Sequence, residues 1–156
     1  MRMRKAWLCF LLLALAAPAG VEAAASGRIL KVLKFYVDAK GRHARSPSLY
    51  QRDAYQAWLR QHPEARGGLR ICVHWAANRE AQKEGLRLRA ELITANSSKA
   101  KPIVVERAVR RGFLGRKWDA LELLGKPYRK AGRLIAWRVT LWSGKKLLAE
   151  ERSFLW

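Results

Sequence analysis

The sequence predicts a mostly β protein, an antiparallel two-layer sandwich with one helix inserted after the first strand. Three observations support this prediction. Several short segments alternate apolar and polar residues with a period of two. Turns rich in glycine, proline and asparagine separate these segments. A single segment has the longer period of a helix, and many short strands at this spacing favour two packed sheets.

The first 25 residues have the pattern of a cleaved signal peptide. A basic start precedes an apolar run at 6–17, and small residues at 23–25 offer cleavage sites. The alternative is a retained anchor, but the run is shorter than the roughly 20 residues that span a membrane. Cys9 lies inside the run, which disfavours lipid attachment. We therefore expect residues 26–156 to be exported, to the periplasm or the exterior, as a single domain.

Removal of this segment leaves a strongly basic chain. It takes away three of the 32 Lys and Arg residues and one of the 12 Asp and Glu residues. The remaining 29 basic and 11 acidic residues give a formal net charge of +18. Such a charge attracts polyanions, although arginine enrichment that merely follows genome composition is the alternative. Cys72 is then the only cysteine, so the domain has no internal disulfide and depends on its packed core.

The first elements are a strand, a turn and the one predicted helix. Residues 29–37 are rich in β-forming residues, and 38–41 read as a turn. Ser46 is a plausible N-cap followed by proline, which predicts a helix over about 47–61. Its apolar stripe, which we expect to cover a sheet rather than bind a ligand, consists of Tyr50, Ala54 and Trp58.

After the glycine pair at 67–68 the period changes to two. Three strands are predicted, at 69–75, 86–92 and 103–109, separated by a polar loop at 78–85 and a turn at 96–101. In the first of these strands, the residues on the core face are Leu69, Ile71, Val73 and Trp75.

Glycines make the segment 112–132 irregular, with room for a short strand at 118–123. The clearest hairpin follows, with strands at 134–142 and 147–156 around a turn at 143–146. We expect its last strand to continue to Trp156. The core face of its first strand is predicted to consist of Ile135, Trp137, Val139 and Leu141.

Several segments resemble a group of small exported bacterial proteins. They are SPSLYQRDAYQAWLR at 46–60, the residues Trp118, Leu121, Gly125, Tyr128 and Gly132, and the stretches AWRVTLW and AEERSFLW near the C-terminus. Those proteins carry an immunoglobulin- or fibronectin-like sandwich and have no assigned function. The resemblance implies that architecture here and transfers no functional residue.

No set of residues forms a recognisable catalytic or metal site. Cys72 and His74 share one side of a strand, where a thiol could lie beside an imidazole. The sequence shows no group that would activate the thiol, so a packing role is the better interpretation. The three histidines lack metal-ligand spacing, and the glycine pairs fit turns better than a phosphate loop. We predict no enzymatic activity, no cofactor and no metal.

Two basic clusters flank the irregular segment 112–132, which also contains Phe113, Trp118 and Tyr128. Loops on a rigid sandwich are common binding platforms, and arginine pairs with phosphates and carboxylates. A simply solvated basic surface is the alternative. The predicted anion-binding residues are Arg107, Arg110, Arg111, Arg116, Lys117, Lys126, Arg129, Lys130 and Arg133. Three further arginines, Arg87, Arg89 and Arg138, extend this surface if their strands are neighbours.

Three hypotheses follow for the function. The leading one is a non-enzymatic exported module that binds anionic envelope components or an acidic partner protein. The second is an accessory or assembly protein that pairs an exposed strand edge with a partner protein. The third is a hydrolase that uses Cys72. Export separates the chain from genomic DNA and RNA, which disfavours nucleic acid as its partner.

Overall fold

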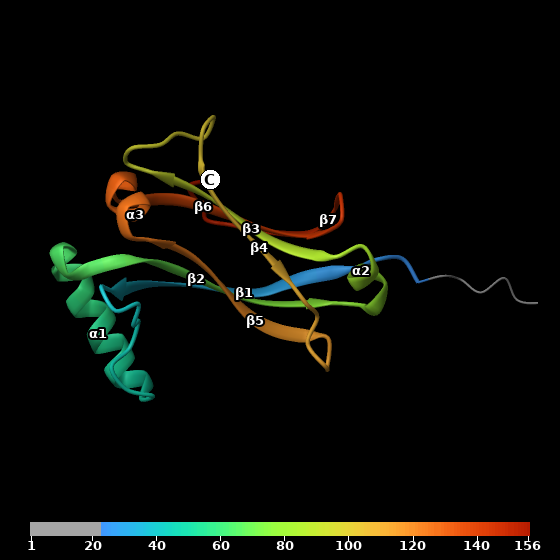
Figure 1. The fold of residues 1–156 in the computed structure, drawn as a ribbon, viewed down its shortest axis with the longest axis horizontal. Helices are drawn as coiled ribbons and strands as arrows, with labels where there is room; N and C mark the ends of the chain where they lie inside the picture. Colours follow the sequence, from blue (N-terminus) through green and yellow to red (C-terminus); the bar gives the residue numbers. More distant parts are fainter. Residues whose placement is uncertain (1–22) are drawn as a thin grey trace, which may run out of the picture.

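Two antiparallel sheets face each other in a computed structural model, which describes residues 23–156 (Figure 1). Residues 1–22 of the predicted signal peptide lie outside the described part of the chain. The strands are β1 (Gly27–Asp38), β2 (Arg66–Ala77), β3 (Leu86–Thr94), β4 (Ile103–Val109), β5 (Arg116–Leu124), β6 (Leu134–Ser143) and β7 (Lys146–Arg152). The helices are α1 (Leu49–Gln61), α2 (Arg79–Lys83) and α3 (Gly125–Ala131), with a 3-10 turn η1 (Pro63–Ala65).

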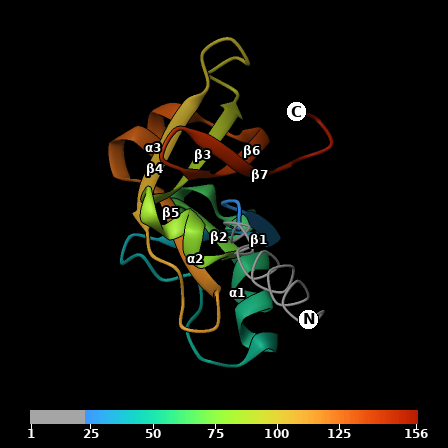
Figure 2. The ribbon, with the colours of Figure 1, turned by 90° about the vertical axis from the view of Figure 1, so that its right-hand side faces the viewer.

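One sheet has three strands in the order β1-β2-β5, and the other has four in the order β4-β3-β6-β7. Every neighbouring pair is antiparallel. Figure 2 shows the two sheets as separate layers, with α1 beside the three-stranded sheet on its side away from the other sheet. The prediction of a mostly β protein with two antiparallel sheets is confirmed.

The core lies between the sheets and follows the period of two in the sequence. The four residues predicted to face inward from β2 are buried, while Arg70, Cys72 and His74 between them are partly exposed. Alternate residues of β3, beginning at Leu86, are buried in the same way. Hydrophobic burial of this kind contributes about 25 cal/mol for each Å² removed from water. Among residues 23–156, the buried hydrophobic residues lie between Val37 and Leu141, so a chain that begins at Ala24 contains the complete described core.

The expected core face of β6 is correct except at its first residue. Trp137, Val139 and Leu141 are buried, but Ile135 is 44% exposed. The β3–β6 register shifts here, because Ala136 pairs with Ile93 while Leu134 pairs with Thr94. Ile135 is therefore an extra residue, and such a bulge turns side chains away from the strict alternation.

Helix α1 occupies the predicted range, but its cap and its buried face were predicted wrongly. The N-cap is Ser48, whose hydroxyl accepts a hydrogen bond from the Gln51 amide, so Ser46 and its proline precede the cap. Tyr50 is 83% exposed, and Ala54 and Trp58 are exposed as well. The buried residues are Tyr55, Gln56 and Leu59.

Polar anchors on β1 explain this rotation of α1. The Gln56 side chain accepts a hydrogen bond from the Tyr36 amide and donates to the carbonyls of Tyr36 and His43. The Tyr55 hydroxyl donates to Asp38 at 2.9 Å. Because buried polar groups need partners, these contacts fix which side of α1 faces the protein, and the apolar stripe does not.

Three further segments differ from expectation. The predicted loop at 78–85 contains α2, which Asn78 caps through the Ala81 amide. The irregular segment contains the whole of β5 and then α3, in whose first turn Pro127 is tolerated because its missing N–H has no partner there. The last strand ends at Arg152, and Trp156 donates its amide to Ser153 in a terminal turn. Among the described residues, no helix has the length and apolar character needed to cross a bilayer.

Candidate functional site

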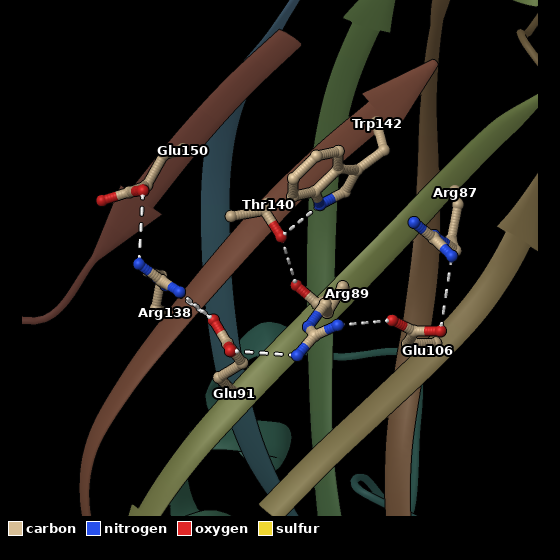
Figure 3. A network of polar contacts seen from close by, with 8 residues as sticks. All are labelled: Arg87, Arg89, Glu91, Glu106, Arg138, Thr140, Trp142 and Glu150. Carbon is tan, nitrogen blue, oxygen red and sulfur yellow. Dashed lines mark hydrogen bonds and ion pairs between the residues drawn. The ribbon is translucent and has the colours of Figure 1, made fainter. Parts of the chain in front are cut away.

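The outer face of the four-stranded sheet carries a ladder of alternating charges (Figure 3). Glu106 pairs with Arg87 and Arg89, at 3.7 and 3.1 Å. Glu91 pairs with Arg89 and Arg138, at 3.2 and 2.5 Å. Arg138 also reaches Glu150 on β7 at 3.8 Å. The three arginines therefore do lie on one exposed sheet face, but carboxylates neutralise them and this face is a poor anion site.

The nine predicted anion-binding residues are divided between separate places along β5. One group extends from Arg107 on β4 through the β4–β5 loop to the first two residues of β5, Arg116 and Lys117. The other lies in α3 and the following turn, after the last residue of β5. A nine-residue strand spans about 27 Å at 3.3 Å per residue. The structure therefore does not bring the nine residues together into one site.

The first group is partly used to hold the β4–β5 loop. Arg107 crosses from β4 and donates to the Ala120 carbonyl of β5 at 3.0 Å. Arg111 donates through Nε to the Ala77 carbonyl at 2.9 Å. Lys117 lies 3.5 Å from a carboxylate oxygen of Asp119. Arg110 and Arg116 remain exposed, and neither has a carboxylate within 4.0 Å among residues 23–156.

Two members of the second group, Arg129 and Arg133, line a groove of about 540 Å³ at the end of the sandwich where α3 lies. Its walls come from both sheets, from η1 and from α3, so the groove opens onto the end of the core. The lining includes Tyr36, Arg66, Tyr128, Arg129 and Arg133. Concave sites with an apolar or aromatic floor and a few polar groups are typical of ligand binding. We take this α3-end groove as the candidate site.

Strand pairing and the end of α1 hold the floor of the groove. The β1–β2 register places Tyr36 opposite Leu69 and Asp38 opposite Arg66. Arg66 donates to the carbonyls of Leu59 and Arg60, which are free at the end of α1. Its guanidinium lies 4.0 Å from the centre of the Tyr36 ring. This residue therefore fixes the floor as well as contributing positive charge.

The wall that carries the arginines depends on a sharp turn at Gly132. This residue has φ 75° and ψ −163°, a conformation that is nearly restricted to glycine. The β3–β4 connection clamps the turn, because Asn96 donates to the Lys130 carbonyl at 2.9 Å and Ala95 donates to the Arg133 carbonyl at 2.8 Å. Arg129 before the turn and Arg133 after it are thereby both placed on the groove.

The electrostatics of the groove favour a negatively charged ligand. Burial raises the pKa of Tyr128, and the nearby Arg66 opposes this rise only in part, so the phenol stays a neutral donor at physiological pH. Arg129 and Arg133 are exposed and have no carboxylate within 4.0 Å among the described residues. Glu64 is the one acidic residue in the lining, and it accepts a hydrogen bond from His62 at 2.9 Å.

Sequence reasoning missed Tyr36 and Arg66. Both lie next to turns, and nothing in their spacing signals a site. They meet only because β1 and β2 pair across the inserted helix. Lys126 and Lys130, which the sequence did single out, are exposed on α3 but do not line the groove.

The surroundings of the cysteine and histidine candidates disfavour a reactive site. Burial raises the pKa of the Cys72 thiol, which disfavours the thiolate that a nucleophile requires. The His74 ring stacks on Trp118 with centroids 4.8 Å apart. Within residues 23–156, no three or more His, Cys, Asp or Glu side chains gather so that they could hold a metal ion.

Comparisons of the chain with protein-family models, with curated proteins and with solved structures gave no significant match.

Proposed function

We propose that the chain is an exported, non-enzymatic binding module whose α3-end groove holds an acidic saccharide of the cell envelope. The observation that carries this proposal is the combination, in one groove, of two tyrosines with two arginines that have no carboxylate partner among residues 23–156. Arginine binds phosphate and carboxylate groups through two parallel hydrogen bonds. Aromatic side chains add apolar contact area and a polar end that can donate to the ligand.

The distribution of charge supports the choice of this groove over the sheet face. On the sheet face each arginine has a carboxylate partner, so an arriving anion has to compete with a fixed one. At Arg129 and Arg133 no such competition exists among the described residues. A ligand with one acidic group and a ring that packs on tyrosine fits both features of the groove.

The test is calorimetric titration of the chain from Ala24 to Trp156 with phosphorylated or uronic-acid oligosaccharides. We expect the double variant R129Q/R133Q to bind at least about tenfold more weakly, since each lost charged hydrogen bond contributes about 1.5–3 kcal/mol. The matched control is R110Q/R116Q, which removes the same charge from the other group. Equal losses in the two variants would contradict a groove site, as would binding of neutral oligosaccharides with the same affinity.

Two other parts of the proposal have their own tests. The strand orders β1-β2-β5 and β4-β3-β6-β7 support an immunoglobulin-like sandwich, because they follow the A-B-E and C′-C-F-G orders of such domains. A different strand order in a crystal structure would contradict this. Export is tested by cell fractionation with N-terminal sequencing, where an intact Met1 in the cytosol would be the contrary result.

A further inference from the structure

The tip of the β4–β5 loop exposes two large apolar side chains. Phe113 is 97% exposed and Leu114 is 84% exposed. The loop projects from the two sheets in both views of the ribbon (Figures 1 and 2). Single exposed apolar residues are common on protein surfaces, but an adjacent pair at a projecting tip is a potential contact site.

The tip is held in one shape. The Gly115 amide donates to the Gly112 carbonyl at 2.9 Å, which closes a turn with the two apolar residues in its centre. The Gly115 carbonyl accepts from the Ala77 amide, and the Arg111 amide donates to the Gln82 side chain. A fixed tip presents its side chains without the entropy cost of ordering a flexible loop on binding.

Basic residues surround the apolar pair on both sides. The chain has no acidic residue between Glu106 and Asp119, a stretch that includes Arg110, Arg111, Arg116 and Lys117. Arg110 and Arg116 lack carboxylate partners within the described part of the chain. Trp118, 46% exposed, follows directly on β5. Apolar residues with flanking cations and an aromatic residue are the composition of segments that bind the surface of anionic membranes.

A second exposed apolar pair provides an internal contrast. Phe154 and Leu155, in the C-terminal turn, are also exposed. Glu150, Glu151 and Arg152 lie close to this pair in the sequence. Exposure is therefore shared by both pairs. Arg152, beside the C-terminal pair, has a carboxylate partner in Glu150 at 3.9 Å, whereas Arg110 and Arg116 beside the β4–β5 tip have none among residues 23–156.

We propose that the β4–β5 tip, residues 110–117, docks the protein on a bilayer that contains anionic phospholipid. Phe113 and Leu114 enter the boundary between headgroups and acyl chains, and Arg110 and Arg116 contact lipid phosphates. The groove lies beyond the far end of β5, about 27 Å along the strand, so docking leaves it open. This inference is independent of the ligand that the groove holds.

The experiment measures co-sedimentation of the chain from Ala24 to Trp156 with vesicles. The vesicles are pure phosphatidylcholine or an equimolar mixture with phosphatidylglycerol. We expect binding to the mixed vesicles that weakens with salt, and weak binding to the neutral ones. The variant F113S/L114S should bind the mixed vesicles about 10- to 100-fold more weakly, because two apolar side chains no longer enter the bilayer.

The matched control is F154S/L155S, which removes the same two residue types from the other exposed pair and should bind as the parent chain does. Both pairs are exposed, so thermal unfolding should be unchanged in both variants. Equal vesicle binding by the parent chain and F113S/L114S would overturn the proposal. Loss in both variants would also overturn it, because the tip would then have no special role.

The groove and the tip can fail separately. R129Q/R133Q should keep vesicle binding while it loses the acidic saccharide, and F113S/L114S should do the reverse. If F113S/L114S instead loses capture of an envelope protein in lipid-free solution and binds vesicles normally, the tip is a protein-docking site and the membrane proposal is wrong.

Discussion

The two ends of β5 carry similar charge but opposite shapes. At the α3 end, arginines border a groove of about 540 Å³ whose floor contains tyrosine rings. At the other end, arginines flank a projecting tip with two exposed apolar side chains. A groove suits a ligand that can be enclosed, and a convex apolar tip suits a surface into which it can insert. Local shape therefore selects between two kinds of partner that net charge alone attracts equally.

The outer face of the four-stranded sheet shows a third arrangement, in which carboxylates pair with the arginines. Glu91 is 7% exposed and neutralises Arg89 and Arg138. We expect Glu91→Ala to lower the free energy of unfolding by about 2–3 kcal/mol, because two partly buried guanidinium groups each lose one of their two carboxylate partners. It should also create a third surface that binds anionic polymers. Urea unfolding and salt-graded binding measure the two effects.

Glu106→Ala is the control for this prediction, because Glu106 lies in the same ladder with a side chain that is more exposed. A loss below about 1 kcal/mol is expected there. Similar losses in the two variants would mean that burial of Glu91 has no special importance.

The turn at Gly132 tests whether the groove end binds its ligand independently of the tip. An alanine Cβ would lie 3.2 Å from the Ala95 Cβ, in a backbone conformation that non-glycine residues avoid. Gly132→Ala should cost about 2 kcal/mol and weaken saccharide binding, while vesicle binding stays unchanged. Gly115→Ala, with φ 80° at the other end, should show the reverse pattern of binding. Measurement of saccharide binding and vesicle binding by both variants distinguishes a local effect on one site from a general loss of stability.

Acid should loosen the groove end before the rest of the fold. Burial by itself raises the pKa of Asp38, but hydrogen bonds from Arg42, Tyr55 and the Lys40 amide outweigh it and lower the pKa to about 2. Since this folded pKa is below the ordinary value of 3.8, the carboxylate stabilises the fold above about pH 4. That contribution disappears as the pH falls towards 2.

Asp38→Asn should therefore lower the free energy of unfolding by about 1–2 kcal/mol at neutral pH. The difference from the parent chain should vanish near pH 2, as urea unfolding across this range can show. Asp53→Asn is the control, because Asp53 is exposed on α1 and, within the part of the chain that the structure describes, its ion pair is with the neighbouring Arg52. A constant difference between Asp38→Asn and the parent chain at all pH values would contradict this assignment.

The smallest expected effect concerns a single charge at the tip. Arg116→Gln should weaken binding to phosphatidylglycerol vesicles about fivefold, since one basic residue near an anionic surface contributes about 1 kcal/mol. It should also reduce the dependence on salt. Arg133→Gln removes the same charge at the groove and should leave vesicle binding unchanged. Equal effects of both substitutions would show that the lipid surface senses only net charge.

Local patterns predicted most of the fold. Alternation in β2 and β3 placed their side chains correctly, because which face a residue occupies follows from the strand period alone. Prediction failed where a nonlocal contact overrides the period. The bulge at Ile135 depends on pairing with β3, and the rotation of α1 depends on partners in β1. Neither partner can be identified from the segment itself.

The sequence by itself determined the strong positive charge, the single cysteine after residue 25 and the strand segments. Only the tertiary structure decided which charges are free. Cross-strand register places Glu91 against Arg138 and leaves Arg129 and Arg133 without carboxylates among the described residues. The register of β1 and β2 brings Arg66 and Tyr36 together across the inserted helix. The physical reason is that strand identity is encoded locally, whereas charge neutralisation depends on pairs that only folding brings within a few ångströms.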